Sequence, residues 1–421
     1  MNLSPADALP SSQKPLSRNR NYNILWSSHF FSDLGSEITF VAFPLLILAV
    51  SGSPLQMGLV SSALAIARMA ANVPAGVIAD RLDRRAVMLV CQGIRGVAMG
   101  GLALTLILDR YSFAYVLVAA VIEGLLSSVF GPAEDASIPQ VVPREQLSQA
   151  VARNTARPFV ASLLGPVAAG FLFTVQRVIP FVVDAVLLVL SFFGLLFLRL
   201  PVREKKEVEA TVRADVAGGF RWVLGNRVIR TTLVWVVLFN LLFHALVIII
   251  LASAGEDHVG AGEMGLMMAF LGAGGLIGGV VAARLQAALP APLIIIGFSW
   301  IAAVMTAAMA AVPSGVLLGV LLGGSIVFAP VANTVVLTYQ MVITPDELRG
   351  RLSGIVAFCA GGAGAIGPLA GGLLMSGGSD LGILACAGGL AVVAAGATLS
   401  PTLRKFPTIR EGAVEAEESL L

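Results

Sequence analysis

The sequence predicts an all-α polytopic membrane protein with twelve transmembrane helices in two pseudo-symmetric six-helix halves. Three observations lead to this fold class. The chain is 57% hydrophobic and only 12% charged, whereas a soluble domain carries about 25% charged residues. Its mean hydropathy is +0.90. Apolar runs of about 20 residues, the length that crosses about 30 Å of hydrocarbon, recur along the whole chain.

The first 199 residues predict a tail and one six-helix half. Residues 1–21 are polar and lack a short apolar core followed by a small-residue cleavage site, so they are interpreted as a cytoplasmic tail rather than a signal peptide. Irregular backbone in lipid would leave polar groups unsatisfied, so each apolar run is expected to be a helix. In the half at 22–199, the runs lie near 24–49, 54–79, 86–108, 112–133, 152–175 and 178–199.

A charged interruption at 200–228 separates this half from the next one. Its signs alternate at 203–207, and its later part, 218–222, is expected to lie on the membrane surface as an amphipathic segment of a cytoplasmic linker. A second half at 229–400 and a cytoplasmic tail at 401–421 complete the chain. The runs of this half lie near 229–252, 262–285, 291–311, 314–337, 352–375 and 380–400.

Three sequence matches indicate that the two halves are duplicates. Residues 76–82 align with 279–285, at an offset of 203 residues. Residues 142–145 align with 344–347, and residues 165–170 align with 367–372, both at an offset of 202. Parallel six-helix repeats of this kind place a substrate site between the halves, near the middle of the bilayer.

The positive charges orient the predicted helices. If the N-terminal tail is cytoplasmic, 23 of the 27 lysines and arginines fall on the cytoplasmic side, with Arg153 and Arg157 among them. Arg110 and Arg177 face the other side, and two arginines fall inside spans. Lysine and arginine accumulate in cytoplasmic segments of membrane proteins. Both termini are therefore predicted to be cytoplasmic.

A dense group of charges lies between the second and third runs. The segment Gly76-Val-Ile-Ala-Asp80-Arg81-Leu-Asp-Arg84-Arg85 resembles the loop signature of the major facilitator superfamily. Residues 130–147, and residues 345–351 leading into Gly367-Pro368, are similar to one branch of that superfamily. This branch includes bacterial enterobactin exporters, macrolide efflux proteins and related multidrug pumps. The resemblance spans residues 20 to 400.

The resemblance implies a role for the segment at 76–85 as a cytoplasmic gate. In the second half Gly279 and Arg284 correspond to Gly76 and Arg81, but Ala283 replaces Asp80. Asp80 is expected to latch the halves together by facing the helix N-terminus near residues 345–346, where the macrodipole favours negative charge. Gly76 is expected to be small enough to allow that approach.

A second motif lies in the fifth predicted helix. Gly165, Pro166 and Gly170 resemble the Gly-Pro motif of drug/proton antiporters. The alternative is ordinary helix packing, because small residues let helices approach closely and proline weakens one backbone hydrogen bond. The sequence also departs from exporters of this kind, which often carry an arginine in the middle of the fourth helix, where this chain has Glu123.

Charged residues inside the spans are candidates for function, because each costs at least about 2.5 kcal/mol in the membrane. Asp33 and Glu37 lie four residues apart, which places both carboxylates on one helix face about 6 Å apart. Such a pair does not readily ionise twice, so one member is expected to hold a proton. The alternative is that one of them pairs with Arg68 or Arg95 to hold the half together.

Further charges strengthen the prediction of proton coupling. Arg68, Arg95, Glu123 and Asp184 all fall within spans of the first half. Together with Asp33 and Glu37 this makes four acids against two arginines, so complete neutralisation needs protons or a cation. These six residues are the predicted coupling site and cavity. The second half offers only uncharged polar residues within its spans, which are Asn240, His244, Asn333 and Gln340, and the first three are the candidates for the cavity. His244 is interpreted either as titratable or as a hydrogen-bonded filler.

The resemblance and these residues together predict a secondary active transporter in the plasma membrane of a bacterium. It would export a hydrophobic or amphipathic small molecule, such as a drug, an antibiotic or a siderophore-like natural product, by proton antiport with alternating access. No metal cluster, catalytic set or phosphate-binding loop occurs in the sequence. The chain is therefore predicted not to be an enzyme and to use no cofactor. It is also predicted to be a monomer that binds no nucleic acid. The alternatives are an importer, a lysolipid flippase or a non-transporting scaffold or receptor.

Overall fold

The computed structural model describes residues 15–200, 223, 225–344, 346–404 and 406. Most of the predicted tails, and most of the linker with its surface segment 218–222, lie outside these residues. The side chains of Asp80 and Asp346 also lie outside them. The prediction that Asp80 faces the helix N-terminus near residues 345–346 therefore stays a prediction.

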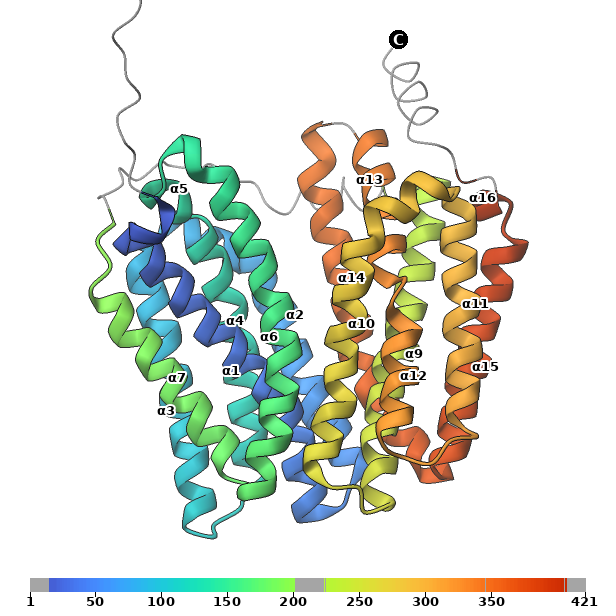
Figure 1. The fold of residues 1–421 in the computed structure, drawn as a ribbon, viewed down its shortest axis with the longest axis horizontal. Coiled ribbons are helices and arrows are strands. Elements are labelled where there is room, and N and C mark those ends of the chain that lie inside the picture. The colour runs from blue at the N-terminus through green and yellow to red at the C-terminus, as the bar shows by residue number, and fades with distance from the viewer. Residues whose placement is uncertain (1–14, 201–222, 224, 345, 405, 407–421) are drawn as a thin grey trace, which may run out of the picture.

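The described residues fold into two bundles of helices that stand side by side (Figure 1). The N-terminal bundle contains α1 (Arg20–Ser51), α2 (Pro54–Arg81), α3 (Arg84–Ile107), α4 (Phe113–Asp135), α5 (Ile138–Val141), α6 (Leu147–Val175) and α7 (Ile179–Leu196). The C-terminal bundle contains α9 (Arg227–Glu256), α10 (Ala261–Ala288), α11 (Ala291–Met309), α12 (Val316–Ile326), α13 (Ala329–Ile343), α14 (Asp346–Leu374), α15 (Ser379–Leu399) and α16 (Pro401–Arg404). The end of the molecule at which α5 and α16 lie is called the proximal end, and the opposite end is called the distal end.

Polar side chains fix where several of these helices begin. At the distal end, Ser53 accepts a hydrogen bond from the backbone N–H of Gln56 at the start of α2, and Ser112 accepts one from Tyr115 at the start of α4. At the proximal end, Asp83 and Asn226 do the same for α3 and α9. These caps satisfy backbone donors that the first helical turn leaves without partners.

Eleven helical stretches of the described residues are long and apolar enough to cross a membrane. The predicted span missing from this set is α2, although it has 28 residues. Ser61, Arg68 and Asn72 lower the hydropathy of α2 because its inward face lines a cavity. The predicted span at 314–337 also differs, since the helix is broken after Ile326 and starts again just before Pro330, which cannot donate a hydrogen bond to a preceding turn.

Glycines bring the two bundles together toward the distal end. A Cβ atom added at Gly372 of α14 would lie 2.5 Å from the Pro54 carbonyl oxygen of α2, and one added at Gly58 would lie 2.5 Å from the Pro368 carbonyl oxygen. A Cβ atom added at Gly170 of α6 would lie 2.7 Å from Gly265 Cα of α10. The missing side chains let the helix backbones touch directly.

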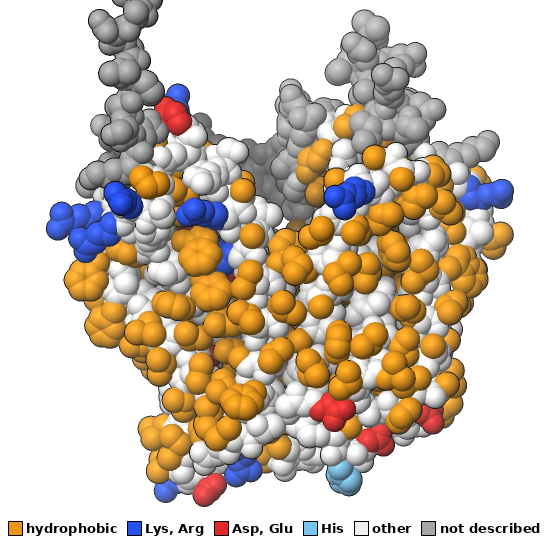
Figure 2. All heavy atoms as spheres, viewed as in Figure 1, with side chains coloured by type: hydrophobic (Ala, Val, Ile, Leu, Met, Phe, Trp, Pro, Cys, Tyr) orange, Lys and Arg blue, Asp and Glu red, His pale blue; other side chains and the backbone are white. Residues whose placement is uncertain are grey.

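The surface matches a membrane setting. Hydrophobic side chains form a broad band across the middle of the face in view, and Lys and Arg gather along its proximal rim (Figure 2). On this face the acidic side chains lie mainly at the distal rim. Exposed apolar residues occur in both bundles, and Val97 (77% exposed) and Val280 (68%) are two of them. In water such a band would be unfavourable, whereas in lipid it is the expected surface.

Candidate transport site

A polar cavity of about 240 Å³ lies within the N-terminal bundle. It is an open cavity lined by α1, α2, α4 and α6. Its lining residues are Asp33, Ser36, Glu37, Arg68, Ser127, Ser128, Pro158 and Ala161. Charged side chains and hydroxyls therefore dominate this space, and it is suited to hold water, a proton or the polar part of a ligand.

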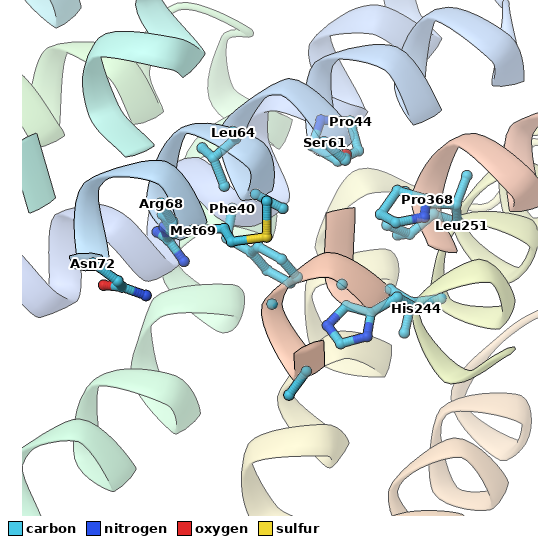
Figure 3. Close-up of a pocket in the computed structure, with 16 residues that line it drawn as sticks. Phe40, Pro44, Ser61, Leu64, Arg68, Met69, Asn72, His244, Leu251 and Pro368 are labelled. Carbon is cyan, nitrogen blue, oxygen red and sulfur yellow. The ribbon is translucent and has the colours of Figure 1, made fainter. Parts of the chain in front are cut away.

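A second cavity, of about 210 Å³, lies between the two bundles. Figure 3 shows side chains of α1 and α2 on one side of it, and His244, Leu251 and Pro368 from α9 and α14 on the other. Its wall is mainly apolar, with Phe40, Leu64, Met69, Val247 and Ile248 among its residues. Arg68 lines both cavities, so the polar space and the apolar space adjoin at this residue.

Glu37 and Arg68 face the polar cavity without fixed partners. Neither side chain forms an ion pair within 4.0 Å with a described residue, and the buried Nε of Arg68 makes no hydrogen bond. The alternative in which Arg68 pairs with Asp33 or Glu37 is therefore not realised in this conformation. Both groups remain available to a ligand or to water.

Asp33 belongs to a different cluster from the one expected. Its carboxylate accepts a hydrogen bond of 2.8 Å from Arg157 Nε of α6 and lies 3.3 Å from His29 Nε2. His29 Nδ1 lies 2.8 Å from Glu134 Oε2, and Arg157 Nη1 lies 3.6 Å from Glu134 Oε1. Two acids and two basic side chains from α1, α4 and α6 therefore form one cluster beside the polar cavity.

Arg95 and Glu123 form a closed ion pair in the core of the same bundle. Both are 0% exposed, and Arg95 Nη2 lies 2.6 Å from Glu123 Oε1 while its Nε lies 2.9 Å from Oε2. The remaining donors of Arg95 bond Ser32, Ser36 and Gln92. A bidentate pair with every donor used is the geometry that compensates burial best.

Asp184 of α7 lies beside this pair but outside its hydrogen-bond network. It is 0% exposed, and neither carboxyl oxygen has a hydrogen-bond partner among the described residues. A Cβ atom added at Gly35 of α1 would collide with Asp184 Oδ1. Asp184, Arg95 and Glu123 line neither of the two cavities, so in this conformation they lie apart from Asp33, Glu37 and Arg68, with which they are grouped in the predicted coupling site.

The sequence argument missed His29, Glu134 and Arg157. Arg157 was counted among the arginines of the cytoplasmic side, and the structure buries it inside the bundle, where it is 4% exposed and pairs with Asp33. The count of four acids against two arginines is therefore incomplete. One signal was available, because His29 precedes Asp33 by one helical turn. Glu134 is joined to the cluster only by the packing of α4 against α1.

The predicted polar residues of the C-terminal bundle contribute little to the cavities. His244 lines the apolar cavity, and its Nδ1 lies 2.8 Å from the Asn240 carbonyl oxygen. The side-chain amide of Asn240 donates to its own helix at the Val236 carbonyl. Asn333 is exposed and lines neither cavity.

The segment at 76–85 makes its described contacts within the N-terminal bundle. Arg84 donates to the carbonyl groups of Ala79 and Ala136, and Arg85 donates to those of Leu195 and Leu196 at the end of α7. Cations at a helix C-terminus are favoured by the macrodipole. Arg81 is exposed.

The close approach expected at Gly76 does not occur in this conformation. Gly76 is exposed, and a Cβ atom added to it would meet nothing within 4 Å. The inter-bundle backbone contacts of α2 lie toward its other end, at Pro54 and Gly58. The bundles are therefore in backbone contact toward the distal end, whereas Gly76 itself has no close neighbour in this conformation.

The motif Gly165, Pro166 and Gly170 of α6 contacts both the cavity helix α1 and the helix α10 of the C-terminal bundle. A Cβ atom at Gly165 would lie 2.3 Å from Glu37 Cβ, so this glycine lets α6 pack directly on the cavity helix α1. Five residues further on, Gly170 contacts Gly265 of α10, and the Pro166 carbonyl oxygen also lies against Gly265. The motif therefore joins the polar cavity to the contact between the bundles.

Two membrane-embedded bundles that enclose a cavity between them define a multi-pass membrane transporter. The family model of the Major Facilitator Superfamily matches residues 25–368. The chain belongs to this superfamily.

Relatives and solved structures agree with this assignment. The multidrug efflux pump Tap of Mycobacterium tuberculosis is 27% identical over 356 residues, which cover 81% of this chain and 83% of Tap. The enterobactin exporter EntS of Shigella boydii is 25% identical over 340 residues, covering 79% of this chain and 80% of EntS. A mutant of the nucleoside transporter NupG superposes with a TM-score of 0.71 at 14% identity, over 90% of this chain and 98% of NupG. A bacterial homologue of the lysosomal transporter Spinster, in an inward-facing conformation, superposes with a TM-score of 0.67 at 15% identity, over 95% of this chain and 98% of its own.

Proposed function

We propose that this protein is a secondary active exporter of a hydrophobic or amphipathic small molecule, driven by proton antiport with alternating access. The observation that carries this proposal is the meeting of two unlike cavities at Arg68, one lined by acids and hydroxyls and the other mainly by apolar side chains. An amphipathic molecule matches this arrangement, with its apolar body between the bundles and its polar group at Arg68.

Proton coupling is assigned to the acids of the polar cavity. Glu37 has no ion-pair partner among the described residues, and Asp33 shares His29 and Arg157 with Glu134. Bringing a proton to either carboxyl group changes the charge that faces Arg68 across the cavity. Protonation and substrate binding would then alter the same electrostatic balance, which is the linkage that an antiporter needs.

The surface and the relatives support the direction of transport. Lys and Arg gather at the proximal rim, which we assign to the cytoplasm of a bacterial cell by the positive-inside rule (Figure 2). The bundles touch toward the distal end, so this conformation would load substrate from the cytoplasm. The relatives Tap and EntS are named as an efflux pump and an exporter. We assign the segment at 76–85 to a gate that closes the proximal end in the opposite conformation.

The proposal is tested in everted membrane vesicles whose interior is more acidic than the medium outside. Addition of an amphipathic probe such as ethidium, a macrolide or a catecholate siderophore is expected to dissipate part of the gradient through the wild-type protein. The double variant Asp33→Asn, Glu37→Gln should lose this effect while its amount in the membrane stays the same. A matched control is Asp109→Asn, because Asp109 is 86% exposed at the distal end and lines neither cavity.

Three results would contradict the proposal. Full activity of the double variant would remove Asp33 and Glu37 from coupling. Substrate flux that ignores the proton gradient would remove antiport. Uptake of the probe into intact cells, against its gradient, would favour an importer of the same fold.

A further inference from the structure

Asp184 is a buried carboxyl group that the packing of α1, α3 and α7 leaves without a hydrogen-bond partner among the described residues. It is 0% exposed, and neither oxygen bonds a described residue. Asp184 Oδ1 lies directly against the backbone of Gly35, where any added Cβ would overlap it. An ionised carboxylate in such a place loses its hydration and gains no hydrogen bond in return.

Arg95, the cation that interacts electrostatically with Asp184, already uses all its donors. A guanidinium group has five N–H donors. Those of Arg95 make five hydrogen bonds, two to Glu123 and one each to Ser32, Ser36 and Gln92. No donor of Arg95 remains for Asp184 unless one of these bonds breaks.

Few charged groups face Asp184 from the helices packed around it. Arg95 of α3 and Glu123 of α4 are the two charged side chains of the described residues that interact with it electrostatically. From α1 it meets the backbone of Gly35. Arg95 and Glu123 already neutralise each other at 2.6 Å, so a negative charge on Asp184 would be the excess charge of the group.

We propose that Asp184 is a proton-storage site that is protonated in this conformation. When it releases the proton, hydrogen bonds of Arg95 move from Ser32 and Ser36 of α1 to Asp184 of α7. This proposal rests on the proton antiport proposed above and names the group that holds the transported proton. When Asp184 ionises, its oxygens draw Arg95 Nη donors away from Ser32 and Ser36. Both serines belong to α1, so loss of the proton loosens the contact of α1 with α3.

The structure also provides a path between this site and the polar cavity. Ser36 lines the cavity. Its hydroxyl donates a hydrogen bond of 2.8 Å to Glu123 Oε1 and accepts one of 2.9 Å from Arg95 Nη2. Its hydroxyl therefore connects cavity water with the Arg95–Glu123 pair that adjoins Asp184. A change of protonation at Asp184 would reach Asp33 and Glu37 through α1, the helix that carries both acids and both serines.

The first test needs no substrate and detects the proton directly. Infrared spectra of the purified wild-type protein at neutral pH should contain the carbonyl stretch of a protonated carboxylic acid. Because Glu37 is a second candidate for a protonated acid, the signal of Asp184 is the component of the band that its own variants change. Asp184→Asn, which has nearly the shape of the neutral acid, should remove that component, and Asp184→Glu should shift it. The matched control Asp33→Asn should leave the component unchanged, because Asp33 is ion-paired with Arg157. Absence of the band in the wild type, or an unchanged band in Asp184→Asn, would overturn the proposal.

The second test measures coupling in proteoliposomes with ethidium. In the wild type an imposed proton gradient should accelerate ethidium efflux at least tenfold over exchange at equal pH. Asp184→Asn should keep the exchange and lose the acceleration. Equal acceleration in the variant would overturn the storage site while leaving antiport intact. No acceleration in the wild type would instead refute antiport, and the infrared result would then decide the protonation of Asp184 separately.

Discussion

The two bundles share a helix plan but differ in what they bury. All the buried charged side chains of the described residues lie in the N-terminal bundle, and they are Arg95, Glu123, Glu134, Arg157 and Asp184, with His29 beside them. The buried polar groups of the C-terminal bundle are, within the same described ranges, hydroxyls and one amide, namely Thr232, Ser253, Ser299, Thr306, Ser325, Gln340 and Thr344. Its interior also holds an aromatic cluster in which the ring centroids of Phe239 and Phe298 lie 4.6 Å apart.

This difference matches a division of labour under the proton antiport proposed above. Buried ionisable groups would let the N-terminal bundle respond to protons, because ionisable residues within a membrane are costly and mark proton pathways. The other bundle supplies an apolar wall and a glycine-lined face against which the first one packs. The two bundles therefore resemble each other in architecture but differ in the chemistry of their interiors.

The largest expected effect comes from breaking the buried pair of the N-terminal bundle. Arg95→Met leaves Glu123 charged and unpaired, which should cost about 3–5 kcal/mol of stability. Adding Glu123→Leu should recover most of that loss, because the uncompensated charge is removed. Thermal unfolding in detergent measures both variants. A matched variant in the C-terminal bundle is Ser299→Ala, which removes the partner of Trp235 Nε1 and should cost only about 1 kcal/mol. Equal losses for Arg95→Met and Ser299→Ala would refute the contrast between the bundles.

A smaller effect is expected where the bundles meet. The Cβ of Gly372→Ala would lie 2.5 Å from the Pro54 carbonyl oxygen, so the helices must separate. Overpacking of this kind costs about 1–3 kcal/mol, and it should shift the population away from the distally closed conformation. Accessibility of a cysteine introduced at Ser53 to a water-soluble thiol reagent reports that shift. Gly388→Ala is the control, because its Cβ would meet nothing within 4 Å. Unchanged labelling in Gly372→Ala would show that this contact does not hold the distal end closed.

The smallest expected effect compares the two walls of the apolar cavity. Removing the His244 side chain in His244→Ala should weaken binding of an amphipathic probe only a few-fold, because its Nδ1 is already committed to its own helix. Removing the guanidinium in Arg68→Ala should weaken binding by about tenfold or more, since a hydrogen bond to a charged group contributes about 1.5–3 kcal/mol. Fluorescence titration with the purified protein measures both affinities. A larger loss for His244→Ala would place the polar end of the ligand in the C-terminal bundle instead.

Particular residues show how far the sequence could lead to this site. Asp33, Glu37 and Arg68 were recognisable because charge within an apolar run is costly wherever it occurs. Their partners were not recognisable, because Arg157 lies 124 positions from Asp33 along the chain and the two meet only when α6 packs on α1. Arg95 and Glu123 were identified as charged positions, yet nothing in their spacing indicated a closed pair outside the cavity.

The sequence by itself determined the membrane class, the approximate positions of the helices and the family. These follow from properties that act locally along the chain, namely the length of apolar runs, the cost of charge in hydrocarbon and a motif read residue by residue. The tertiary structure decided which charges are paired, which line a cavity and which glycines join the bundles. It also separated Asp184 from the cavity and left it without a partner among the described residues. Such outcomes depend on contacts between helices distant in sequence, and only the packed bundle fixes those contacts.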